Sequence, residues 1–80
     1  MKVLKVNELV KGCLYIKVSP TSFGSLLQGR IFLVYNILPT NIRIFKLCPI
    51  KGYENRLLRG SISIYSQELF IKLGDAVWQH

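Results

Sequence analysis

The side chains that could carry out covalent chemistry are few in this chain and lie far apart. The one histidine is His80, at the end of the sequence, where a chain is prone to fray. Nucleophilic catalysis needs a base held beside the nucleophile, so neither the serines nor Cys13 and Cys48 have a suitable partner. The sequence therefore argues against a hydrolytic triad.

Carboxylate chemistry and metal binding find equally little support. The four acidic residues stand singly along the chain: Glu8, Glu54, Glu68 and Asp75. A structural zinc site needs four ligands, commonly in close pairs. Cys13, Cys48 and His80 form no such pair. We therefore predict a protein that is not an enzyme and that uses no metal and no cofactor.

A strong positive charge is the main feature that remains. Eleven Lys and Arg residues against four acids give a formal net charge of +7, without a run of like charges typical of a disordered tail. Such a surface attracts nucleic acid or an acidic protein face. The plainer alternative is that the charge keeps an oily domain soluble, because 50% of the residues are apolar. That apolar content also leaves open a patch covered by a partner or by a second copy of the chain, that is, a homo-oligomer.

Basic residues interleaved with aromatic ones form the only pattern with functional content. Tyr15 and Lys17 share one face of an expected strand, and Arg43 and Phe45 share a face of another. If both faces lie on the same side of a sheet, nucleic-acid bases could stack on the rings while phosphates follow the cations. The predicted contact residues are Lys17, Arg43, Lys51, Tyr53, Arg56 and Arg59, with Tyr15 and Phe45 as stacking groups. The alternative is that Tyr15 and Phe45 are core residues.

Two functions follow from this pattern. The first is a small basic module that binds nucleic acid or a protein that handles nucleic acid. The alternative is a phage-type interaction module that inhibits or regulates a host enzyme by docking on an acidic surface. Abundant Phe, Ile, Lys, Asn and Tyr, whose codons are A/T-rich, together with the single alanine Ala76, favour a viral or mobile-element origin.

Residue types indicate β-structure, because branched and aromatic side chains suit a pleated, half-buried surface. We expect strands over 13–18, 31–37, 42–48 and 61–65, with a hairpin between the second and third. The range 31–37 is apolar almost throughout and is expected to be a central strand. Ser66 is expected to cap a short helix over 67–73, which Gly74 ends. A last strand or tail over 75–80 would be anchored by Trp78.

These elements predict one all-β domain over residues 1–80. Its layout resembles that of small SH3-like barrels in element lengths: a partly open barrel of about five short strands and one C-terminal helical turn. An α+β sheet covered by one helix is the alternative. No apolar segment has signal-peptide or membrane-helix length. We therefore expect a cytoplasmic protein that does not enter the membrane, with Cys13 and Cys48 as free, buried thiols.

Overall fold

The part of the chain that the structure describes forms one antiparallel sheet of six strands, which bends around its own core. The computed structural model describes residues 2–20, 26–47, 52 and 56–75. The strand order in the sheet is β1-β6-β2-β3-β4-β5. The elements are β1 (Leu4–Lys5), a 3-10 turn (Val6–Glu8), β2 (Cys13–Lys17), β3 (Ile31–Ile37), β4 (Asn41–Leu47), β5 (Leu57–Ser63) and β6 (Leu69–Asp75). The predicted all-β class is confirmed.

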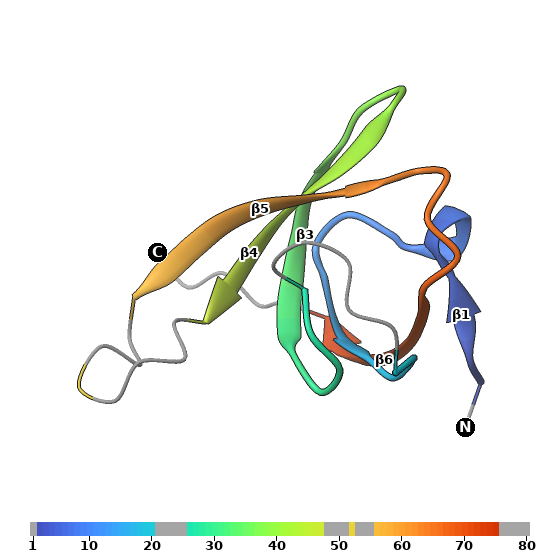
Figure 1. Ribbon diagram of the computed structural model, residues 1–80. Helices are drawn as coiled ribbons and strands as arrows, with labels where there is room; N and C mark the ends of the chain where they lie inside the picture. Colours follow the sequence, from blue (N-terminus) through green and yellow to red (C-terminus); the bar gives the residue numbers. More distant parts are fainter. Residues whose placement is uncertain (1, 21–25, 48–51, 53–55, 76–80) are drawn as a thin grey trace.

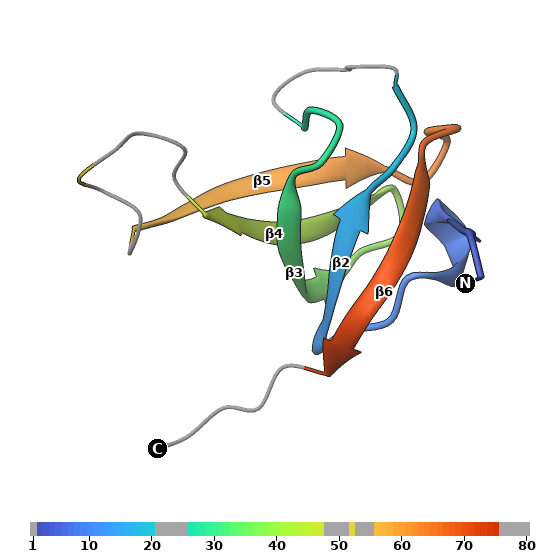
Figure 2. The ribbon, with the colours of Figure 1, turned by 90° about the horizontal axis from the view of Figure 1, so that it is seen from below.

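The sheet bends sharply between its two halves. β6, β2 and β3 run side by side, while β4 and β5 cross them at a steep angle (Figure 1, Figure 2). The register slips by one residue between β3 and β4, because Val34 pairs with Ile44 while Asn36 pairs with Arg43. Tyr35 is the extra residue of this bulge, and bulges increase the local twist of a strand pair. The bend leaves β1 and β5 as the two edges of an open sheet.

The core lies on the inner face of the bend. Phe32 of β3 is 1% exposed, and its ring packs against Tyr15 at 5.9 Å and edge-on against Phe70 at 5.4 Å. Three consecutive residues of β3 are buried: Phe32, Leu33 and Val34. Because consecutive residues point to opposite faces, both faces of β3 are covered at its middle. The predictions of a central strand over 31–37 and of a hairpin with the next strand are therefore confirmed.

The predicted helix over 67–73 is wrong, because this part of the chain forms strand β6. β6 pairs with β1 on one side and with β2 on the other, and Phe70 is fully buried between them. Ser66 does accept a hydrogen bond from the Glu68 amide, at 3.3 Å, but strand β6 begins at Leu69 and no helix forms. Gly74 lies inside the strand opposite Leu14. The apolar spacing fitted both structures, and only the two neighbouring strands decided between them.

Other boundaries moved by a few residues. The strand expected over 61–65 begins earlier, at Leu57, and ends at Ser63. β1 and β6 raise the number of described strands to six, and the described helical turn is N-terminal. Cys13 is a free, buried thiol, whereas Cys48 and Trp78 lie outside the described residues. A helix suited to crossing a membrane is absent from the described residues.

A glycine in β5 makes room for a lysine from β4. A Cβ atom added to Gly60 would lie 3.2 Å from Cε and 3.5 Å from Nζ of Lys46. Lys46 therefore crosses the inner face of β5 at this position, and its residue is 6% exposed. Gly74 of β6 is a natural comparison, because a Cβ atom there would meet nothing within 4 Å.

We predict that Gly60→Ala is less stable than Gly74→Ala by about 1 kcal/mol, because only the methyl group added in β5 would force a packed side chain to move. Gly74→Ala should be neutral or stabilising by about 0.4–1 kcal/mol, since alanine restricts the unfolded chain. Urea unfolding of both variants measures the difference. Equal stabilities would show that Lys46 does not pack against β5 as described.

Candidate functional site

The sequence-predicted site residues are divided between the two faces of the sheet. Tyr15 pairs with Phe32, and Phe45 pairs with Leu33. Directly paired residues point to the same face, and consecutive residues of one strand point to opposite faces. Tyr15 therefore lies on the inner face and Phe45 on the outer face. The single platform that would have combined both strand faces does not form.

Lys17 belongs to the interior and is removed from the set of contact residues. Its side chain is fully buried, and its Nζ lies 3.0 Å from Oε2 of Glu68. The same Nζ donates a hydrogen bond to the backbone oxygen of Ser19 at 2.7 Å. A buried lysine is tolerated where a carboxylate and further hydrogen bonds compensate its lost hydration. Lys17 is therefore a structural cation that a partner cannot reach.

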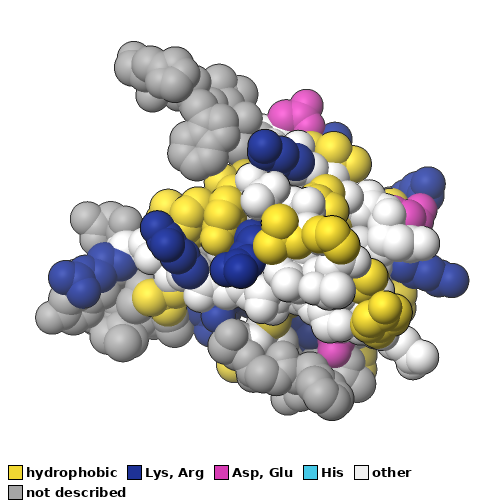
Figure 3. Space-filling model, turned by 90° about the horizontal axis from the view of Figure 1, so that it is seen from above, with side chains coloured by type: hydrophobic (Ala, Val, Ile, Leu, Met, Phe, Trp, Pro, Cys, Tyr) yellow, Lys and Arg dark blue, Asp and Glu magenta, His cyan; other side chains and the backbone are white. Residues whose placement is uncertain are grey.

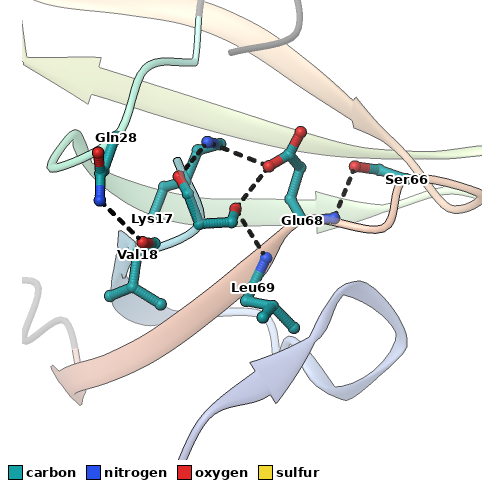
Figure 4. Close-up of polar contacts among 7 residues, drawn as sticks. Lys17, Val18, Gln28, Ser66, Glu68 and Leu69 are labelled. Atoms are coloured by element: carbon teal, nitrogen blue, oxygen red, sulfur yellow. Dashed lines mark hydrogen bonds and ion pairs between the residues drawn. The ribbon is translucent and has the colours of Figure 1, made fainter. Parts of the chain in front are cut away.

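Ser19 completes a polar network around this ion pair (Figure 4). Its hydroxyl donates to Glu68 Oε2 at 2.6 Å and accepts from the Leu69 amide at 3.1 Å. Nearby, the side chain of Gln28 donates to the backbone oxygen of Val18 at 3.1 Å. The network joins the end of β2 to the start of β6, two segments that lie about fifty residues apart in the chain.

Tyr15 is also a core residue, which agrees with the alternative interpretation of the sequence. It is 1% exposed, and its hydroxyl accepts a hydrogen bond from the Val10 amide at 2.8 Å. Burial raises the pKa of the Tyr15 phenol, so this side chain stays neutral and hydrogen-bonded inside the protein. It is not available as a stacking group for a ligand.

Three of the predicted residues, Arg43, Phe45 and Arg59, lie on the outer face of β4 and β5, beside Tyr35 of β3. Arg43 and Phe45 are two residues apart on β4 and therefore point to the same face. Phe45 lies directly opposite Arg59 of β5. The rings of Phe45 and Tyr35 stack with centroids 4.2 Å apart and planes inclined by 24°. Both arginines are exposed and both rings are half-buried. We call this cluster the outer patch: Tyr35, Arg43, Phe45 and Arg59.

Lys and Arg side chains lie beside hydrophobic ones near the middle of the face in Figure 3. Arg56 is exposed just before β5. Lys51 and Tyr53 lie outside the described residues. Tyr35 is the member that sequence reasoning missed, because residues 31–37 are apolar almost throughout and their alternation does not distinguish the two faces.

The carboxylates of the described residues are engaged elsewhere. Glu8 pairs with Lys2 at 3.7 Å, Glu68 with Lys17 at 3.0 Å, and Asp75 with Lys72 at 3.0 Å. The hydrogen bond between the last pair lowers the pKa of Asp75 and raises that of Lys72. Within the described ranges, neither arginine of the outer patch forms an ion pair. The patch therefore presents two positive charges that are available to an anion.

Metal chemistry has no candidate in the part of the chain that the structure describes, where no three His, Cys, Asp or Glu side chains come together. The Cys13 thiol donates a hydrogen bond to Asp75 Oδ1 at 3.3 Å, and these two side chains alone do not make a metal site.

No protein-family model, curated protein or solved structure matches this chain. The outer patch is therefore interpreted from its own geometry.

We predict that Lys17→Met destabilises the protein by about 3–5 kcal/mol, because Glu68 would be left charged and buried. Lys17→Met combined with Glu68→Leu should recover most of this loss. Lys72→Met, which breaks an exposed ion pair, should change the free energy of unfolding very little. Thermal and urea unfolding measure all three variants. A double variant as unstable as Lys17→Met would contradict the assignment of a buried pair.

Lys46 provides a second electrostatic prediction. Burial, and secondarily the nearby charge of Arg30, lowers the pKa of Lys46 from 10.5. Between the folded and unfolded pKa values the unfolded chain holds more protons, so the free energy of unfolding should rise with pH there. We expect wild type to gain stability relative to Lys46→Met between neutral pH and about pH 10. Urea unfolding at both pH values tests this, and a constant difference would disprove it.

Proposed function

We propose that this protein is a binding module whose outer patch binds single-stranded nucleic acid. The observation that carries the proposal is that two exposed arginines lie beside a stacked aromatic pair on one face of the sheet. Phosphates need cations that are not already neutralised, and bases need an aromatic surface beside them. The outer patch offers both within three adjacent strands.

The arrangement of the patch favours a single strand over a duplex. Phe45 is adjacent to both arginines, because Arg43 is two residues away on the same strand and Arg59 is directly opposite. A strand whose phosphates contact Arg43 and Arg59 would have its bases over the Phe45 and Tyr35 rings. Bases can reach such rings only when they are unstacked from a complementary strand. Duplex DNA or RNA would offer the patch its phosphates alone.

The overall charge supports the same function. With a net charge of +7, the chain attracts polyanions from a distance, which raises the rate of encounter. Contacts of this kind carry little base specificity, because every base has an aromatic face and every nucleotide a phosphate. The proposed activity is therefore holding a single strand with little sequence preference, without covalent chemistry.

The test is the salt dependence of binding to a fluorescein-labelled oligothymidylate, measured by fluorescence anisotropy. Wild-type affinity should fall steeply between about 50 and 200 mM salt, because binding releases counterions. Arg43→Gln combined with Arg59→Gln should weaken binding and make the slope of log K against log salt shallower by about 1.4, since two phosphate contacts are lost. Phe45→Leu should weaken binding by about 1–3 kcal/mol and leave the slope unchanged.

The matched control is Lys2→Gln combined with Lys5→Gln, which removes the same charge from exposed positions at the β1 edge, the end of the sheet opposite β5. This variant should bind almost like wild type. Equal losses in the two double variants would mean that net charge alone drives binding. The absence of salt-sensitive binding in wild type would refute the proposed function.

A further inference from the structure

The free edge of β5 is the longest unpaired strand edge among the described residues. The sheet ends at β1 on one side and at β5 on the other. β1 has two residues and offers little backbone, whereas β5 has seven. Edge strands normally pair with something or are kept short, bulged or interrupted by proline, because their open backbone groups attract another strand. β5 contains no proline, and its pairing with β4 is regular throughout.

The ladder identifies which backbone groups of β5 face away from β4. The Ile64 amide donates to the Thr40 oxygen at 3.3 Å, so this pair is hydrogen-bonded. Bonded and non-bonded pairs alternate along an antiparallel ladder. In the same register, Ile62, Gly60 and Leu58 are therefore bonded to β4. The amides and carbonyls of three alternate residues point to the open edge: Leu57, Arg59 and Ser61.

These three residues have no backbone hydrogen bond on that side to any described residue. The Ser63 carbonyl, next in the series, is already used because it accepts from the Ser66 amide at 3.0 Å. Apolar side chains are also exposed at the start of the strand, with Leu57 at 52% and Leu58 at 41%. A strand added along this edge would satisfy the open amides and cover both leucines.

A cavity of 720 Å³ continues this edge at the C-terminal half of β5. Ser61, Ile62 and Ser63 form one wall. The other walls come from Ser19, Pro20, Leu26 and the segment 65–68. Ile62 and Leu26 are buried and give the cavity an apolar base, while the serine hydroxyls line its sides. An extended segment that pairs with β5 would therefore run into a formed groove.

The charges around β5 indicate the chemistry of the segment that fits there. Arg59 is exposed on the outer face, Lys46 crosses the inner face at Gly60, and Arg56 is exposed just before the strand. Lys46 is 6% exposed, so the cations that an added segment can reach lie on the outer face of β5 and just before its start. A second copy of this chain would bring its own β5 arginines against these, and like charges side by side are unfavourable in a sheet. An extended segment rich in Asp and Glu would find an opposite charge at Arg59 and a further cation just before the strand.

We propose that the β5 edge and its adjoining groove bind an extended acidic segment of a partner protein, which adds to the sheet as a seventh strand. Backbone hydrogen bonds to Leu57, Arg59 and Ser61 supply affinity, and the flanking cations select acidic side chains. This binding uses the edge of the sheet and does not depend on nucleic acid binding by the outer patch.

The probe is a fluorescein-labelled peptide of about ten residues that alternates Glu with Val or Thr, long enough to cover a strand. Its control is the same peptide with Lys in place of Glu. Ser61→Pro removes an amide that faces the open edge, and proline is tolerated at such edge positions. Ser61→Thr is the matched variant that keeps the amide. We expect the acidic peptide to bind wild type and Ser61→Thr, and to bind Ser61→Pro at least about tenfold more weakly.

Hydrogen exchange of the wild-type protein gives a measurement that does not depend on how well Ser61→Pro folds. The amides of Leu57, Arg59 and Ser61 should exchange rapidly in the free protein and become protected when the acidic peptide is added. Tight binding of the Lys peptide, full binding by a folded Ser61→Pro, or protection elsewhere would overturn the proposal. A wild-type dimer that Ser61→Pro dissolves would do the same, because the occupant would then be a second copy.

Oligothymidylate binding by Ser61→Pro separates this proposal from the function of the outer patch. Ser61→Pro leaves Arg43, Phe45 and Arg59 in place, so its affinity for the oligonucleotide should equal that of wild type. Protection of the three edge amides by the oligonucleotide in place of the peptide would overturn the edge proposal. Loss of peptide binding alone in Ser61→Pro would support it, whatever the outer patch binds.

Discussion

The buried ion pair between Lys17 and Glu68 constrains β2, because the strand can turn its Lys17 face inward only where a carboxylate meets the lysine. Two charges can be buried at 3.0 Å from each other only because each compensates the lost hydration of the other. Ser19 adds hydrogen bonds to the same carboxylate and to the amide of Leu69, so the end of β2 and the start of β6 are held together. With Lys17 inside, Tyr15 must be inside as well, because residues two positions apart on a strand point to the same face.

This orientation separates the cations of the chain into two groups with different roles. Lys17 and Lys46 lie within the bend of the sheet, where burial dominates their energetics. Arg43 and Arg59 lie on the opposite face, where water reaches them and no described carboxylate pairs with them. A net charge of +7 therefore overstates the positive charge that a partner can reach, because two of the lysines lie in the interior.

β5 can serve two surfaces because a strand presents side chains and backbone in different directions. Its side chains point above and below the sheet, and its free amides and carbonyls lie in the plane of the sheet. Arg59 contributes its guanidinium to the outer patch and its backbone to the edge. The open form of the sheet makes this arrangement available, because closure into a barrel would have paired β5 with another strand.

The sequence alone determined the β class, the central strand, the β3–β4 hairpin and the clustering of Arg43 with Phe45, because strand alternation and turn residues are local properties. Only the tertiary structure decided the remaining features. Residues 67–73 carry an apolar spacing that suits a helix or a strand, and pairing with β1 and β2 made it a strand. Tyr15 and Lys17 share one face of β2, and the local sequence pattern could not show whether that face points into the core or towards solvent. Their place in the interior depends on Glu68, which is distant in the chain and becomes a neighbour only when β6 pairs with β2.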